Sequence, residues 1–323
     1  MRLVLGGRAG GSRREGVPAH TYSIVARDPA TGLLGVAVQS HYFGVGAVVP
    51  WAEPGVGVVA TQSFLNVGYG PEGLAAMRAG RTAPEALAEA VARDPERHLR
   101  QVAMVDAAGT VAAHTGERCV AAAGHLTGDS FSVQANLMAS AEVWPAMARA
   151  YEASSGDLAD RLIAALEAAQ AAGGDLRGQQ SAALLIVGGE QLERPWEGRL
   201  FDLRVEDHPT PLVELRRLVR LARAYRHVEA GDAAVGQGRV EDAAAAFREA
   251  VDLAPEIAEL KVWAALSLLR MGREAEAMPL FGAAFAANPA LGELVPRVVP
   301  LGLAPDDPVV LARIAALRPN PEA

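Results

Sequence analysis

The sequence predicts an α+β fold, in which a domain of stacked sheets covered by helix pairs precedes an all-α repeat domain. Up to residue 208, segments follow the order β-rich, helical, β-rich, helical, β. The strand-like runs are apolar on both faces, as when two sheets pack together beneath helices. Beyond residue 211 the chain reads as helical and carries an internal repeat. A doubly wound α/β sheet is the alternative, but the early hairpins lack its regular strand–helix alternation.

The first β-rich block begins with a hairpin. TYSIVAR (21–27) and LLGVAVQS (33–40) have strand character, and DPATG (28–32) between them has the residues of a tight turn. With Arg27 opposite Leu34, antiparallel pairing places Thr21 opposite Ser40. GVGVVATQS (55–63) is the third predicted strand.

Two helices are predicted next. One runs from Pro71 to Ala79 with Gly80 as its stop, and the other begins after Thr82, the predicted N-cap. The residues 100–116 read as a second hairpin. The remaining predicted elements are a strand over 130–138, helices over 141–153 and 157–171, and strands over 181–188 and 200–207.

His208-Pro-Thr-Pro211 marks the predicted domain boundary, because two prolines interrupt the pattern there. Beyond it, five positions recur 34 residues later, which is the tetratricopeptide period. They are Gly238, Ala243, Phe247, Ala250 and Pro255, repeated as Gly272, Ala277, Phe281, Ala284 and Pro289. We therefore expect a disordered or removed extension over 1–20, a sandwich domain over 21–208 and a tetratricopeptide-like domain over 212–323, with capping helices at 212–229 and 306–317.

Composition excludes several functions. The net charge of −8 argues against a nucleic-acid surface and gives no reason to expect membrane binding. The single cysteine, Cys119, rules out an intrachain disulfide and suits the cytoplasm. The first 20 residues do not resemble a secretory signal, and no apolar run approaches the length of a membrane span. Phosphate-binding, dinucleotide and zinc-protease motifs are missing, so we predict no cofactor and no metal.

The hairpin carries the candidate chemistry. Alternation puts Thr21 and Ser23 on one face, beside the corner Gln39-Ser40-His41. A threonine hydroxyl at this position suits a nucleophile only if Thr21 is the first residue of the chain. Its α-amine, with a pKa of about 8, can then act as the general base.

Several runs resemble the family of domain of unknown function 1028, within the N-terminal-nucleophile (Ntn) hydrolases. They cover the residues 20–74, 112–119, 133–138, 177–187 and 202–209. The resemblance implies the four-layer αββα sandwich of that superfamily, in which the first residue of the mature chain is the nucleophile. Thr21 stands at this position here. Twenty residues precede it, so His20–Thr21 is cleaved, the true start lies later, near Val17, or Thr21 stays internal and inactive.

The resemblance also suggests helper groups. Proteasome-like members use a lysine beside the threonine, but Lys261 is the only lysine of this chain. The α-amine must therefore act as the base, and we expect Ser23, Ser40 or His41 to adjust its basicity. Asn136 is the first candidate for stabilising the oxyanion and Gln62 the second, although each equally suits a buried amide that links the sheets.

Two functions remain open. In the first, Thr21 hydrolyses a linear amide C–N bond of a small molecule or peptide. In the second, the protein is an inactive scaffold that binds a protein partner through the repeats at 225–290. A homodimer is compatible with both.

Overall fold

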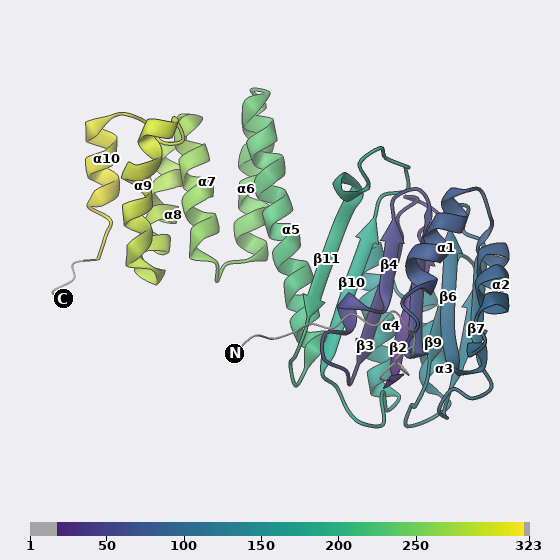
Figure 1. Ribbon diagram of the computed structural model, residues 1–323. Helices are drawn as coiled ribbons and strands as arrows, with labels where there is room; N and C mark the ends of the chain where they lie inside the picture. Colours follow the sequence, from purple (N-terminus) through teal and green to yellow (C-terminus); the bar gives the residue numbers. More distant parts are fainter. Residues whose placement is uncertain (1–17, 320–323) are drawn as a thin grey trace, which may run out of the picture. The chain divides into compact units, whose positions relative to one another are not determined.

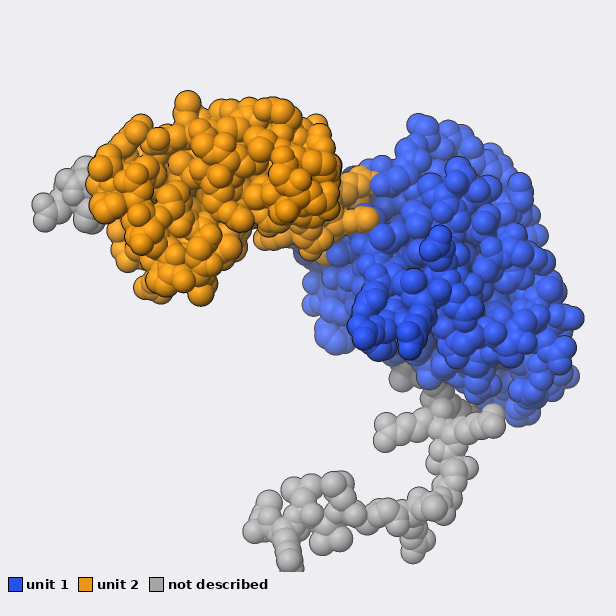
Figure 2. All heavy atoms as spheres, turned by 90° about the horizontal axis from the view of Figure 1, so that it is seen from above, with its two compact units in different colours: residues 1–216 blue, residues 217–323 orange. Residues whose placement is uncertain are grey.

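The computed structural model describes residues 18–319. The chain divides into two compact units, residues 1–216 and 217–323 (Figure 2). The first unit contains two antiparallel sheets with their helices, and the second is helical (Figure 1). This confirms the predicted order of a mixed domain with antiparallel sheets followed by a helical region. The division falls inside helix α5 (Pro211–Gly236), slightly beyond the predicted boundary.

The six-stranded sheet contains the predicted first hairpin at its centre, and its strand order is β11-β10-β3-β2-β9-β8. Thr21 pairs with Ser40 and Arg27 with Leu34, so the register predicted from the turn is confirmed. Gly32 closes that turn with a φ of 75°, a conformation that favours glycine. The strands are β2 (Thr21–Arg27), β3 (Leu34–Ser40), β8 (Gly124–Gly128), β9 (Phe131–Ala135), β10 (Ser181–Val187) and β11 (Arg199–Val205).

The five-stranded sheet is built around β5 (Gly57–Phe64), which pairs with β6 (Arg100–Asp106) along one edge. Two short strands share its other edge. The strand β4 (Pro50–Glu53) pairs with residues 57–60, and β1 (Pro18–Ala19) pairs with residues 63–64. The strand β7 (Val111–Thr115) completes the sheet beside β6, as the predicted second hairpin requires.

The two sheets stack face to face, and a helix pair covers each outer face (Figure 1). Val25, Val36 and Leu185 of one sheet share a buried cluster with Val58 and Val105 of the other. On the five-stranded sheet lie α1 (Tyr69–Arg78) and α2 (Ala83–Arg93); on the six-stranded sheet lie α3 (Val143–Ala153) and α4 (Leu158–Ala171). The predicted N-cap of α2 is confirmed, since Thr82 and Glu85 form a capping box.

Three short strands were not predicted. The strand β4 begins with Pro50 and lies at a sheet edge, where a proline is tolerated. The strand β8 is only half-buried and has glycine at both ends, so it lacks an apolar pattern. The strand β1 falls within the expected extension 1–20. It is formed by Pro18–Ala19, and residues 1–17 lie outside the described residues.

The helical unit repeats its structure where the sequence repeats. Gly238 and Gly272 each lie just after a helix and have a positive φ. Phe247 and Phe281 are buried in equivalent helices. A Cβ at Gly231 would lie 2.6 Å from the Phe247 ring, so glycine is required for this close approach. After α5 come α6 (Val240–Leu253), α7 (Ala258–Arg270), α8 (Glu274–Ala287), α9 (Leu294–Val298) and α10 (Pro308–Ala315). No helix in the described part of the chain is long and apolar enough to cross a membrane.

Candidate functional site

Thr21 lies buried at the first position of β2, and its hydroxyl belongs to a short chain of hydrogen bonds. Thr21 Oγ1 donates to Ser40 Oγ at 3.1 Å. Ser40 Oγ in turn donates to the carbonyl oxygen of His20 at 2.6 Å. The register of β2 and β3 produces this arrangement, because it places the two hydroxyl groups on one face at the end of the hairpin. The Thr21 hydroxyl is thus connected to the carbonyl group of the peptide bond that precedes it.

The His20 carbonyl receives a second donor. Arg177 Nη2 lies 2.8 Å from this oxygen, and the same nitrogen lies 2.8 Å from Oδ2 of the buried Asp175. A second contact of 3.1 Å joins Arg177 Nε to Asp175 Oδ1, so the carboxylate fixes the guanidinium in place. Two donors that converge on one carbonyl oxygen are the arrangement that stabilises an oxyanion.

His20 marks the place where the main chain crosses from one sheet to the other. The strand β1 belongs to the five-stranded sheet and β2 to the six-stranded sheet. His20 is 6% exposed, and its ring meets the Phe64 ring edge-on, with 6.1 Å between centroids. Its Nδ1 donates to Asn136 Oδ1 at 2.9 Å, since an amide oxygen only accepts. Burial lowers the pKa of His20 and the Arg177 charge adds to this, against the opposing effects of Asn136 and Asp175.

A network of buried amide side chains fills the space between the sheets next to Thr21. Gln62 Nε2 lies 3.2 Å from the Thr21 carbonyl oxygen and 2.7 Å from Gln101 Oε1. Asn136 donates its backbone N–H to the same Thr21 oxygen at 3.1 Å and its Nδ2 to Gln101 Oε1 at 2.9 Å. Gln134 Nε2 donates to Ser23 Oγ, which donates to Gln62 Oε1, both at 2.6 Å. This network holds the Thr21 backbone and joins the two sheets.

The predicted site residues therefore fall into three groups. Ser40 contacts the Thr21 hydroxyl, whereas Asn136 and Gln62 contact its carbonyl oxygen. Ser23 lies in the amide network, one step away from Thr21. His41 has an exposed side chain, and its backbone N–H donates to Asp175 Oδ2 at 3.3 Å. The structure ties His41 to the site through its backbone.

Sequence reasoning missed Arg177, Asp175, Gln101 and Gln134. The first two precede β10, whose first residue Ser181 pairs with Ser40. A residue just ahead of β10 therefore lies near Thr21. This position could be inferred only once the pairing of β10 with β3 was known. Gln101 lies opposite Gln62 in the β5–β6 pair, so that hairpin could have indicated it.

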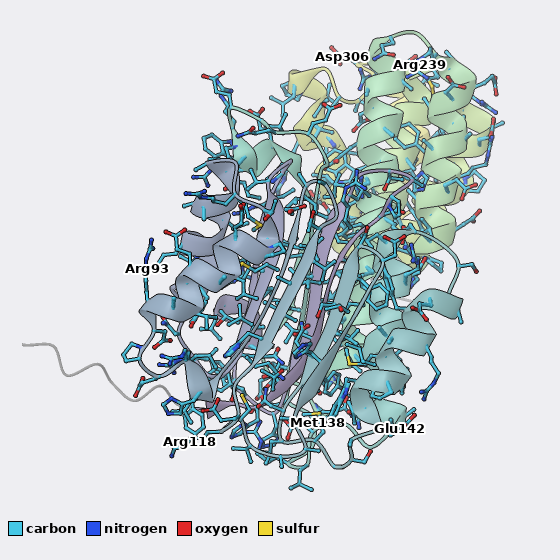
Figure 3. All side chains as sticks on the ribbon, turned by 90° about the vertical axis from the view of Figure 1, so that its right-hand side faces the viewer. Arg93, Arg118, Met138, Glu142, Arg239 and Asp306 are labelled. Carbon is cyan, nitrogen blue, oxygen red and sulfur yellow. The ribbon has the colours of Figure 1, made fainter. Side chains whose placement is uncertain are left out.

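A separate cavity of about 430 Å³ lies between the start of α1, the end of α2 and the start of β6. Its buried charges satisfy each other, with Arg100 Nε 2.9 Å from Asp94 Oδ2. Side chains alternate along β6, so Arg100 points away from Gln101 and from the space that contains Thr21. We assign this cavity a structural role. Figure 3 shows Arg118 and Met138 at one end of the sheets. Among residues 18–319, no three histidine, cysteine or acidic side chains gather to hold a metal ion.

Residues 21–215 match the family model described as "Family of unknown function (DUF1028)". The chain belongs to this family. The DUF1028 match begins at Thr21 and includes Ser40, Asn136, Asp175 and Arg177. A crystal structure of a DUF1028-family protein from Silicibacter pomeroyi is similar, with 32% identity and a TM-score of 0.57. The alignment covers 63% of this chain and 89% of that one. A search of curated proteins found no match.

Proposed function

We propose that the DUF1028 domain is an Ntn-type hydrolase that cleaves a linear amide C–N bond with Thr21 as nucleophile. The observation that carries this proposal is the hydrogen-bonded chain from Thr21 Oγ1 through Ser40 Oγ to the His20 carbonyl oxygen. Thr21 also stands at the start of a central strand in a helix–sheet–sheet–helix arrangement. This arrangement supports assignment to the αββα sandwich of the Ntn superfamily.

The same chain of contacts offers a route by which Thr21 becomes N-terminal. Thr21 Oγ1 attacks the His20 carbonyl carbon, its proton moves to Ser40 Oγ, and Ser40 gives its own proton to the carbonyl oxygen. The tetrahedral intermediate then loses its C–N bond as the hydroxyl proton moves to the Thr21 nitrogen. An ester now joins His20 to Thr21 Oγ1, and the α-amine is free. Water hydrolyses this ester, so residues 1–20 leave with a carboxylate and the hydroxyl is restored.

Turnover reuses these groups. The free amine of Thr21 accepts the proton of Oγ1 as that oxygen attacks the substrate carbonyl, and it then protonates the departing nitrogen. The resulting ester is hydrolysed by water, which releases the acid. We assign stabilisation of the oxyanion to Ser40 and Arg177, because they already donate to a carbonyl oxygen beside Thr21. Asn136 and Gln62, the first and second candidates predicted for this role, direct their side-chain nitrogens to Gln101 and to the Thr21 carbonyl.

Arg177 also supplies the positive charge that a lysine provides in proteasome-like enzymes. A cation close to the α-amine disfavours its protonated form, which keeps the amine available as a base near neutral pH. Asp175 limits this effect and positions the guanidinium. Base chemistry thus rests on the amine, beside a guanidinium that comes from a distant loop.

The test is mass spectrometry of the purified full chain, combined with amidase assays. We expect an N-terminus at Thr21, and we expect Thr21→Ala to retain residues 1–20 and lose activity. Thr21→Ser should be processed, because it keeps the hydroxyl. Thr127→Ala, which removes an exposed hydroxyl from β8, is the matched control. A fully active chain that still carries His20 would contradict the proposal.

For the helical unit we propose a tetratricopeptide-like pair of repeats that binds a protein segment. The buried Phe247 and Phe281 at equivalent positions support this assignment. If Thr21 stays internal, this unit would be the functional part of a scaffold protein. An intact chain without amidase activity that captures a defined peptide through residues 225–290 would favour that alternative.

A further inference from the structure

We infer that Pro18–His20 occupies the acyl-binding side of the site, so the substrates are extended peptides with a histidine-like residue before the scissile amide. This inference rests on the proposed function and names the substrate class of that same site. Its basis is a chemical identity. The ester that processing leaves on Thr21 Oγ1 is the same species as the acyl-enzyme formed from a peptide that ends in the sequence before Thr21. A site that hydrolyses the first must hydrolyse the second.

The main chain ahead of Thr21 is bound as a strand. Pro18 pairs with Phe64 and Ala19 with Ser63, antiparallel to the edge of β5. The neighbouring strand β4 ends its pairing at Ala60, so this stretch of edge is left for β1. Addition of an extended peptide to a sheet edge is a common recognition mode, in which main-chain hydrogen bonds provide affinity. Departure of residues 1–20 would leave the same edge open for a substrate.

The His20 ring occupies a pocket that suits a flat group with one N–H donor. The pocket buries all but 6% of the residue, with Asn136 Oδ1 as acceptor and the Phe64 ring in an edge-on contact with the His20 ring. A neutral ring fits best, because burial and Arg177 both disfavour the imidazolium. An aliphatic side chain would leave Asn136 Oδ1 without this donor, and a buried acceptor that loses its partner is destabilising.

The His20 carbonyl then defines where the reacting carbonyl lies. Its oxygen is 2.6 Å from Ser40 Oγ and 2.8 Å from Arg177 Nη2. Backbone, ring and carbonyl of one short segment are therefore all held at once. This agreement distinguishes a bound acyl group from a linker that merely passes the site.

The experiment uses the full chain after processing at Thr21 and two matched peptides, acetyl-Pro-Ala-His and acetyl-Pro-Ala-Ala, as free acids and as coumarin amides. We expect the histidine acid to bind at least about tenfold more tightly, as loss of a buried hydrogen bond and ring contacts predicts. The histidine amide should be cleaved with a kcat/KM higher by a similar factor.

A variant separates recognition from stability. Asn136→Leu should reduce the preference for acetyl-Pro-Ala-His over the same peptide with phenylalanine in place of histidine. General destabilisation would not change this ratio. Equal binding of the histidine and alanine acids by the processed chain would overturn the inference while leaving the hydrolase proposal intact. A chain that never acquires an N-terminus at Thr21 would overturn both.

Discussion

Ser40 is the residue that links the Thr21 hydroxyl to the His20 carbonyl, so its removal tests the proton route directly. We expect Ser40→Ala to slow cleavage of the His20–Thr21 bond about 10²-fold or more, the usual effect of losing a positioned group that transfers a proton. A time course of intact mass measures this rate. Ser181→Ala is the matched control, because Ser181 pairs with Ser40 across the strands but donates to the Tyr42 carbonyl. Similar slowing in both variants would indicate a packing effect.

His20 makes the stability of the bound segment before Thr21 depend on pH. Its pKa is lowered in the folded state, mainly by burial, from an ordinary value of 6.5. The folded segment therefore binds fewer protons than the released one. Its stabilisation is fully present above pH 6.5 and is lost as the pH falls through the lowered pKa.

Hydrogen exchange of the Ala19 and His20 amides in the unprocessed Thr21→Ala chain measures this release. We expect protection to fall between pH 7.5 and pH 5. His20→Gln in the same background is the control, since glutamine can donate to Asn136 Oδ1 without titrating in this range. Protection that stays constant for the histidine chain would refute the assignment.

At the scale of elements, the buried pair between Asp94 and Arg100 fastens the end of α2 to the start of β6. Their side chains are 4% and 6% exposed, with 2.9 Å between Oδ2 and Nε. Burial alone would raise the pKa of Asp94, but the hydrogen bonds from Arg100, the Glu96 backbone and Asn66 lower it. The Asp94 carboxylate therefore remains ionised at neutral pH.

We expect Asp94→Ala to destabilise the sheet unit by about 3 kcal/mol, because Arg100 loses its buried partner and keeps only the more exposed Glu96 carboxylate and the Phe64 carbonyl. The exposed pair of Glu89 and Arg93 on α2 provides the comparison, and Glu89→Ala should cost at most about 1 kcal/mol. Denaturant titration, in which cleavage at Thr21 is the measured signal, reports on the stability of this unit. Equal losses in the two variants would show that burial does not decide the contribution.

The elements also show how far the sequence could predict the site. The turn at 28–32 and strand alternation sufficed to pair Thr21 with Ser40, because both are local. The loop that carries Asp175 and Arg177 reaches Thr21 through the pairing of β10 with β3, which joins distant parts of the chain. No local pattern encodes such a pairing. The same limit applies to β1, since an edge strand of two residues has no period to recognise.

At the scale of the whole molecule, the stability of the helical unit and cleavage at Thr21 can be tested separately. Every residue that holds the His20 carbonyl lies before residue 182, whereas Phe281 is fully buried in the helical unit. Phe281→Ala should therefore destabilise the helical unit by about 3–5 kcal/mol and leave cleavage at Thr21 unchanged. Val309→Ala, at a side chain 69% exposed, should change neither.

Thermal unfolding followed by circular dichroism, together with intact mass, distinguishes the outcomes. A lower melting transition with normal processing is expected for Phe281→Ala, because the proton route from Thr21 to His20 requires no group of the second unit. Loss of processing would mean that the sheet unit depends on the helical unit for its fold. The repeats would then contribute to activation as well as to any binding of a partner.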